Sequence, residues 1–519
     1  MMSATAVAVT TGDAPPPNKH HVVIVGAGLA GLTCARELLL RTHDTVRVTL
    51  VEADDRVGGR IRADRKFVPG HVFDLGAEFI HGKGTLLTEL IEDLQRNKAW
   101  KHSDHNYDAA DEDFFEEIFI TSHADGGPDE QPTSTGKYGM YYVGGELLMY
   151  NDPILHELHD ALEEILEDTV TDPEVSFQDA LLRRQPPLSA QLHSLAIASY
   201  GNSAACSNLA DLSLSMIMAF EKHWEENEIE GDYRLPSRIG MHGVVQGLLD
   251  MLTPHPNFEL RLQSKVQDIT QDSDGVQIGS CDGVGRQVLL RADAVVVTVP
   301  PPVLANMNVD LSAAKQHALS FVGFERVMKV CAKFKTRPWP TDLQSIVCAA
   351  SGSDHHSMNT TAIPEMWFRE FVDVDDADAT VYVAVGYLTS AAADDFIANT
   401  TNSDIDAKSS SNDSLTRATD IFLRQLTQVL SVPLLQLLDA HQETLLYDWK
   451  DDCPSVHGGY VYPKTGATVE VWQALAQPDG RLFWAGEATN TAACCTVQAA
   501  METAVRAAEQ VKVFLGTPL

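Results

Sequence analysis

The feature that most constrains this chain is a glycine-rich turn between an apolar run and a helical pattern near the N-terminus. Residues 21–31 read HVVIVGAGLAG, in which four consecutive apolar β-branched residues stop at Gly26. Such a run predicts a strand buried on both faces, and the pattern over 29–40 predicts a helix directly after the turn. Gly26, Gly28 and Gly31 have the GxGxxG spacing of a dinucleotide-binding βαβ unit, in which a phosphate binds the amides that open the helix.

An acidic residue stands where this unit requires one. A second strand pattern, 46–51, ends at Glu52, about 20 residues past the glycines, where a carboxylate accepts hydrogen bonds from a ribose. The alternative is a glycine turn formed for packing reasons and followed by a chance acid. The complete order of strand, glycines, helix, strand and acid favours a nucleotide site.

The residues after this acid point to one dinucleotide. They read EADDRVGGR and place Arg56, Gly58, Gly59 and Arg60 in a second glycine turn. Here the chain resembles the flavin-dependent amine oxidases, which include monoamine oxidases, polyamine oxidases and lysine-specific histone demethylases. The resemblance implies that this turn wraps FAD, with the arginines near its phosphates and isoalloxazine edge.

Four later segments carry the same resemblance. They are VFDLGAEFIHG at 72–82, ADAVVVTVPPPVL at 292–304, WKDDCPSVHGGYVY at 449–462 and GRLFWAGEAT at 480–489. The resemblance implies an α/β chain in which a Rossmann-like FAD-binding domain is interleaved with a mixed α+β substrate-binding domain. We predict an FAD domain made of 20–105, 235–305 and 442–519, a substrate domain made of 106–234 and 306–441, and a flexible tail over 1–19.

The resemblance also assigns residues to the cofactor. It implies noncovalent FAD, because Cys453 does not stand beside the glycines where flavinylated monoamine oxidases keep their cysteine. Glu487 would bind ribityl or pyrophosphate oxygens, and the amides that open a helix reaching about residue 514 would face the flavin N1/C2 carbonyl. The implied cofactor residues are Gly26, Gly28, Leu29, Ala30, Gly31, Glu52, Ala53, Arg56, Gly59, Arg60, Gly76, Ala77, Glu78, Val266, Gly486, Glu487, Thr496 and Val497.

Three residues are implied at the reacting end. Lys329 lies in 324–340, whose alternation predicts a half-buried strand, and matches the family's lysine that holds a water beside flavin N5. His81 would project near the reacting site, although hydrogen bonding to loop backbone is an equal alternative. Tyr460 would stand in an aromatic cage for the substrate nitrogen, with core filler as its alternative.

The C-terminal helix departs from the family pattern. The usual Gly-Ala and Ser-Gly pairs are replaced by Ala499-Ala500 and Thr503-Ala504. Each replacement adds at least a methyl group where the helix should contact cofactor or sheet. The departure affects the expected geometry of the substrate pocket.

Composition excludes several classes of partner. With 73 Asp and Glu against 38 Lys and Arg, the net charge of −35 repels nucleic acid and anionic membrane. The eight cysteines contain no CxxC pair and indicate reduced thiols.

No run of 18 apolar residues predicts a membrane span, and no leader is recognised, so we expect a cytoplasmic protein without a specific protein partner. No metal site is expected, because residues 156–159 read HELH rather than HExxH.

The implied reaction is oxidation of a primary or secondary amine. A hydride equivalent would pass from the carbon beside a neutral amine to the flavin, the imine would hydrolyse to an aldehyde, and O2 would be reduced to hydrogen peroxide. The acidic composition leans toward a polyamine-like substrate. An L-amino-acid oxidase of the same fold would need an arginine clamp, for which Arg369 is available, and a flavin-binding protein without turnover is the third hypothesis.

Overall fold

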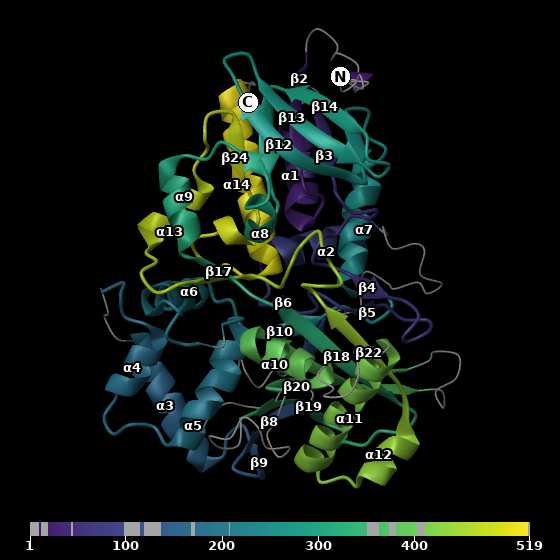
Figure 1. The fold of residues 1–519 in the computed structure, drawn as a ribbon, viewed down its shortest axis with the longest axis vertical. Coiled ribbons are helices and arrows are strands. Elements are labelled where there is room, and N and C mark those ends of the chain that lie inside the picture. Colours follow the sequence, from purple (N-terminus) through teal and green to yellow (C-terminus); the bar gives the residue numbers. More distant parts are fainter. Residues whose placement is uncertain are drawn as a thin grey trace, which may run out of the picture.

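The computed structural model describes residues 10–11, 19–42, 45–97, 115–118, 136–167, 172–206, 208–349, 363–372, 380–401 and 411–516. A parallel sheet lies in the upper half of the molecule and a seven-stranded sheet in the lower half (Figure 1). The chain passes between the two halves several times.

The upper half is built on a five-stranded parallel sheet. Its strands in order are β11 (Phe258–Arg261), β3 (Val46–Val51), β2 (His20–Val25), β15 (Ala294–Val297) and β24 (Leu482–Trp484), and all neighbours are parallel. The helix α1 (Leu29–Arg41) connects β2 to β3, which confirms the predicted βαβ unit. Three distant parts of the chain therefore meet in one sheet, as the Rossmann-like prediction requires.

Different layers cover the two faces of this sheet. One face packs against α1 and three further helices: α2 (Leu86–Arg96), α7 (Gly240–Leu252) and α14 (Val497–Leu515). The other packs against an antiparallel sheet of β12 (Ser264–Gln271), β13 (Val276–Asp282) and β14 (Gln287–Ala292). The edges of this second sheet are β1 (Thr10–Thr11) and β16 (Asn308–Val309). The apolar runs are buried between these layers.

The lower half is built on the seven-stranded sheet. In order its strands are β22 (His441–Asp448), β18 (Val327–Phe334), β21 (Val381–Thr389), β20 (Glu365–Phe371), β19 (Leu343–Cys348), β8 (Tyr138–Val143) and β9 (Glu146–Met149). One face packs against α10 (Ser390–Thr401), α11 (Ser411–Leu430) and α12 (Leu434–Ala440). A helical group stands beside it, made of α3 (Pro153–Glu167), α4 (Phe177–Arg183), α5 (Ala190–Ala196) and α6 (Leu214–Glu226).

Short elements complete the described chain. They are β4 (Ala63–Asp64), β5 (Phe73–Asp74), β6 (Ile80–His81), β7 (Glu116–Ile118), β10 (Asp232–Arg234), α8 (Pro301–Leu304), α9 (Ala313–Ser320), β17 (Val322–Phe324), β23 (Val461–Pro463) and α13 (Val469–Ala476). β7 pairs with β10, so residues 116–118 of the predicted substrate domain form a strand. The remainder of 98–135 lies outside the described residues.

Three sequence-based expectations can be compared with these elements. β22 pairs with β18, so the seven-stranded sheet includes residues on both sides of the predicted domain boundary at residue 442. The predicted half-buried strand over 324–340 is wrong: β18 is shorter and buried on both faces except at Lys333, because helices cover one face and residues from the upper half cover the other. Within the predicted tail, Thr10–Thr11 pair with β14, and the other residues before Lys19 lie outside the described part.

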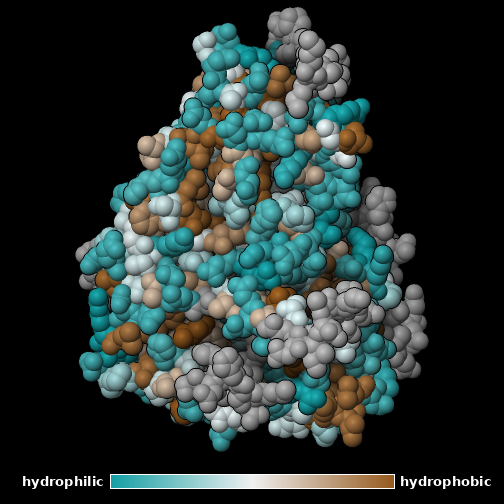
Figure 2. All heavy atoms as spheres, viewed as in Figure 1, coloured by the Kyte–Doolittle hydropathy of each residue, from teal (hydrophilic) through white to brown (hydrophobic). Residues whose placement is uncertain are grey.

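Figure 2 shows that one face of the molecule is largely hydrophilic, with a hydrophobic patch over α12 at the lower right, where Leu435 is 81% exposed. Across the described ranges, no helix combines the length and apolar character needed to cross a bilayer.

Candidate functional site

A continuous cavity of about 2700 Å³ joins the two halves of the molecule. Its walls run from the β2–α1 turn, past Lys329 on β18, to the end of α6. Pockets that hold a drug-sized ligand typically enclose about 300–1,000 Å³. This cavity therefore has room for a dinucleotide together with a second ligand.

Two glycines shape the nucleotide end of the cavity. A Cβ on Gly31 would lie 1.9 Å from the carbonyl oxygen of Gly26, so only glycine lets α1 begin this close to β2. Gly59 has φ +54° and faces Gly28, whose Cα would lie 3.2 Å from an added Cβ. Within the described residues no side chain caps α1, and Leu29 and Ala30 line the cavity. The positive end of this helix is thus available to a phosphate.

Glu52 stands at the end of β3 and is held there by backbone. Its Oε2 accepts a hydrogen bond from the Ala27 amide at 2.7 Å, and its Oε1 accepts one from the Asp54 amide at 2.9 Å. Burial raises the pKa of this carboxyl. Ala53 and Val266 line the same part of the cavity.

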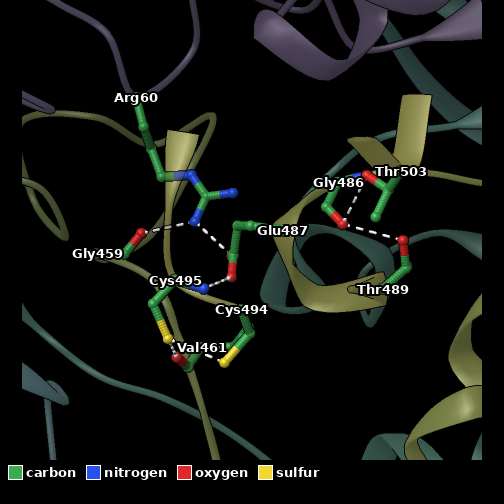
Figure 3. A network of polar contacts seen from close by, with 9 residues as sticks. All are labelled: Arg60, Gly459, Val461, Gly486, Glu487, Thr489, Cys494, Cys495 and Thr503. Carbon is green, nitrogen blue, oxygen red and sulfur yellow. Dashed lines mark hydrogen bonds and ion pairs between the residues drawn. The ribbon is translucent and has the colours of Figure 1, made fainter. Parts of the chain in front are cut away.

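The two arginines of the second glycine turn act differently. Arg56 donates hydrogen bonds to the carbonyls of Val57 and Ile61 at 3.1 Å and of Gly59 at 2.8 Å, which fixes the shape of the turn. Arg60 reaches away from the turn. Its Nη1 donates to Glu487 Oε1 at 2.6 Å and to the Gly459 carbonyl at 2.9 Å (Figure 3).

Glu487 thereby joins three parts of the chain. Its side chain is 4% exposed, and its Oε2 accepts a hydrogen bond from the Cys495 amide at 3.2 Å. The neighbouring Gly486 amide donates to Thr503 Oγ1 at 2.9 Å (Figure 3). The Thr503 hydroxyl therefore holds the turn at Gly486.

The start of α14 faces the same cavity. Thr496 caps the helix by accepting a hydrogen bond from the Ala499 amide at 3.1 Å. Thr496, Val497 and Ala500 line the cavity, whereas Ala499 is completely buried. The methyl groups added at Ala499, Thr503 and Ala504 therefore lie in the buried interior and do not line the cavity.

Glu78 is the centre of a buried charge cluster. Its carboxylate lies 2.9 Å from Lys329 Nζ, 2.8 Å from Arg234 Nε and 3.2 Å from Arg369 Nη1. Burial opposes ionisation of Glu78, but the positive charges, led by Lys329, outweigh it and lower the pKa to about 2. The neighbouring Asp74 has the opposite shift, since burial and then the Glu78 charge raise its pKa to about 7.

Lys329 uses all three of its N–H donors in this cluster. Besides Glu78, its Nζ donates to the carbonyls of Asp74 and Gly76, both at 3.1 Å. The ammonium also lies 5.2 Å from the centre of the Trp367 ring. A water bound by this lysine would have to replace one of the three acceptors.

Two tyrosines are joined at the cavity wall. The Tyr460 hydroxyl donates to the Ser203 carbonyl at 2.6 Å, so the Tyr387 hydroxyl donates to Tyr460 at 2.8 Å. Burial raises the pKa of both phenols. The pair is neutral and fixed in direction.

Strand register sets one row of side chains across the large sheet. Tyr387 is the partner of Lys329 on one side and of Glu365 on the other, so all three point to the same face. Glu365 is 3% exposed, lines the cavity, and accepts a hydrogen bond from Asn202 Nδ2 at 3.1 Å. Neither Tyr387 nor Glu365 was found by sequence reasoning, because only register places them beside Lys329.

The far end of the cavity is acidic. His81 lies there, with its Nδ1 2.6 Å from Asp232 Oδ1 and its ring 5.6 Å from Trp224. Acidic residues from α3, α6 and neighbouring strands line this region: Glu117, Glu163, Glu221, Glu225, Glu226, Glu230 and Asp232. Where the structure describes the chain, no group of three or more His, Cys, Asp or Glu residues is arranged to hold a metal ion.

A sequence profile decides the family. The profile described as "Flavin containing amine oxidoreductase" matches residues 29–512. The chain belongs to this family of flavin-containing amine oxidoreductases. The predicted family and fold are therefore confirmed, and the two glycine turns, which an added Cβ would obstruct, suit a bound flavin dinucleotide.

Curated relatives of this amine oxidoreductase include two functional groups. It is 25% identical to human Lysine-specific histone demethylase 2 over 96% of the chain and 54% of the relative. It is 24% identical to Probable polyamine oxidase 4 of Arabidopsis thaliana over 90% of the chain and 82% of the relative. The chain thus spans about half the length of the demethylases it matches.

Solved structures of the same fold are similar along the whole amine oxidoreductase. Putrescine oxidase bound to putrescine has a TM-score of 0.67 at 18% identity, covering 95% of this chain and 99% of that one. Cyclohexylamine oxidase from Brevibacterium oxydans also has a TM-score of 0.67 at 18% identity, covering 96% and 100%.

Proposed function

We propose that this chain is an oxidase that binds FAD noncovalently and oxidises polyamine-like primary or secondary amines with O2, giving an imine or aldehyde and hydrogen peroxide. The observation that carries the proposal is the row of Lys329, Tyr387 and Glu365 on one cavity that begins at the glycine turn and ends at an acidic wall.

The cofactor part rests on the nucleotide end of the cavity. The α1 amides and the two glycine turns would hold the diphosphate, Glu52 the ribose, and the start of α14 the flavin carbonyl side. When bound, the flavin would accept a hydride equivalent from the amine carbon and return the electrons to O2. Noncovalent binding is proposed because Cys453, although it lines the cavity, does not stand beside the glycines at 458–459.

The substrate part rests on where the charges lie. An amine must be neutral to lose a hydride equivalent from its neighbouring carbon. The cluster around Glu78 pairs three cations with that carboxylate, and burial keeps the neighbouring Asp74 only partly ionised near pH 7, so an ammonium group beside Lys329 is disfavoured and sheds its proton. The reacting nitrogen is therefore kept neutral at this end.

A second, charged nitrogen suits the other end of the row. Glu365 lies two strands from Lys329, which is about 10 Å at the usual strand spacing. A buried carboxylate at this distance would bind the distal ammonium of a diamine or polyamine through a charge-assisted hydrogen bond. The acidic wall beyond it would attract the polycation from solution.

The amino-acid oxidase alternative lacks support at its key residue. Arg369, the available clamp for a substrate carboxylate, is 8% exposed and forms an ion pair with Glu78. A carboxylate entering the cavity would also approach Glu365 and the acidic wall. The relatives include an L-amino-acid oxidase from Siganus canaliculatus, 26% identical over 62% of the chain, so amino acids belong in the test.

The test is anaerobic bleaching of the flavin absorbance band after reconstitution with FAD. We expect bleaching by putrescine, spermidine or spermine, and peroxide release when air is admitted. Bleaching by amino acids alone would establish the alternative oxidase, and bound FAD that no amine bleaches would establish a flavin-binding protein without turnover. Protein that takes up no FAD would contradict the proposal altogether.

A further inference from the structure

Two consecutive cysteines stand on the cavity wall just before α14. Cys494 Sγ and Cys495 Sγ are 3.0 Å apart (Figure 3), and both residues line the cavity. Cys494 is 4% exposed and Cys495 is half-buried. The reaction proposed above uses neither thiol.

We propose that Cys494 and Cys495 form a reversible thiol–disulfide switch that responds to hydroperoxides. Cys495, the more exposed thiol, attacks the peroxide: an S–O bond forms, the O–O bond breaks, and hydroxide leaves and takes up the thiol proton to become water. Cys494 then attacks the resulting sulfenic acid, so that the S–S bond forms, the S–O bond breaks and a second water leaves. Two thiols are oxidised and one peroxide is reduced.

The surroundings support this division of roles. Cys495 is the more exposed of the two thiols and lies two residues before the first residue of α14. Burial, followed by the neighbouring Cys495, raises the pKa of the Cys494 thiol. Cys495 is therefore the thiol that a peroxide in the cavity reaches first, and the buried Cys494 supplies the second sulfur of the bridge.

The bridge between neighbouring residues is easily reopened. Consecutive Cα atoms are about 3.8 Å apart, which is less than the usual disulfide separation of about 4.4–6.8 Å. Strain of this kind makes a disulfide labile to thiols. Cys495 already has φ +73°, a left-handed conformation uncommon for a residue with a side chain, and it is held there by hydrogen bonds.

Those hydrogen bonds connect the thiols to the functional site. The Cys495 thiol donates to the Val461 carbonyl at 2.8 Å, and its amide donates to Glu487. Val461 follows Tyr460 in the chain, and Glu487 is the partner of Arg60. Oxidation removes the thiol hydrogen and turns the peptide to close the ring, so both contacts are lost and the flavin is held less tightly.

The experiment treats the purified, flavin-loaded protein with hydrogen peroxide and maps its peptides by mass spectrometry. We expect the peptide containing both cysteines to lose two hydrogen atoms, to resist iodoacetamide and to become reactive again after dithiothreitol. Flavin release should accelerate about tenfold, the effect of losing one charge-assisted hydrogen bond. The switch needs only added peroxide, so its outcome does not depend on the proposed amine oxidation.

Matched variants make the result decisive. Cys281→Ser removes a half-buried thiol on β13 and should leave both the bridge and the release unchanged. Cys494→Ser should abolish the bridge and instead add oxygen at Cys495. Two thiols that alkylate equally before and after peroxide, oxygen addition in the natural sequence, or a bridge without faster flavin release would each overturn the proposal.

Discussion

Lys329 Nζ lies 2.9 Å from Glu78 Oε2, and this buried ion pair joins residues 251 positions apart. Lys329 is on β18 of the seven-stranded sheet in the lower half, whereas Glu78 follows β5 in the chain. The pair therefore fixes the two halves to each other at the wall of the cavity that joins them. In the proposed reaction it also belongs to the group of cations that keeps the amine neutral.

Replacing this lysine tests its place at the reacting end. We expect Lys329→Met to slow anaerobic flavin reduction at least about tenfold while FAD stays bound, because the cation nearest the reacting amine is lost. Stability should fall by about 1.5–3 kcal/mol, since Glu78 keeps two arginines. Stopped-flow absorbance and urea unfolding measure the two effects. Lys333→Met on the same strand, which removes contacts to Phe67 and Glu443, is the control, and equal reduction rates in both variants would remove Lys329 from the site.

Glu365 should determine the preference for a second amino group. Glu365→Gln should raise KM for putrescine or spermidine about 10- to 100-fold through loss of a charged hydrogen bond, with little change for a monoamine. Steady-state peroxide assays across both substrate classes check this. The matched control is Glu370→Gln on the same strand, whose carboxylate contacts Arg337 at the surface. A parallel rise for monoamines would show that Glu365 has a structural role only.

Asp74 should make stability fall as pH rises. Its pKa is raised to about 7 in the folded protein, against about 3.9 when unfolded. The native state therefore holds more protons between these values, and the free energy of unfolding decreases with rising pH across that window. The pKa of Asp74 is also influenced by three neighbouring charges, which belong to Glu78, Arg369 and Lys329.

The matching substitution is Asp74→Asn, which keeps an oxygen that can accept from the Met241 amide. We expect it to exceed the natural protein in stability at pH 8 by up to about 4 kcal/mol, and the difference to vanish near pH 4. Denaturant unfolding across this range measures it. A difference that does not change with pH would mean that Asp74 is ionised in both states.

The ion pair of Arg60 and Glu487 should hold the cofactor pocket together. Glu487→Gln keeps the shape of the side chain but removes its charge, so FAD affinity should weaken about tenfold. Titration of the flavin-free protein with FAD measures the change. Glu509→Gln on the outer face of α14, 45% exposed beside Arg41, should leave the affinity as it was, and equal effects of the two variants would contradict the assignment.

Local sequence patterns predicted the first βαβ unit of the upper half well. The strands β2 and β3 and the helix α1 have the expected ranges because the apolar runs, the glycines and the acid are all close in sequence. The two glycine turns beside them follow from backbone geometry that only glycine permits. Segments that match a family motif were likewise brought to the same cavity.

The side-chain contacts of the lower half, which contains the seven-stranded sheet, could not be predicted from the sequence in the same way. Alternation in 324–340 indicated a half-buried strand, yet the polar residues of β18 are paired across the interface, Lys329 with Glu78 and Lys333 with the Phe67 carbonyl. Tyr387 and Glu365 became visible only through strand register. Such partners are set by tertiary contacts, and no local pattern in the sequence encodes them.

Helix α14 packs against α1, and both belong to one apolar core. During synthesis, the first helix of the nucleotide unit must therefore wait for a partner that leaves the ribosome more than 450 residues later. The part of its apolar side that α14 covers stays exposed throughout that interval. We therefore expect the site beside α1 and α14 to be complete only after the whole chain has been synthesised, and shorter nascent chains to be prone to aggregation.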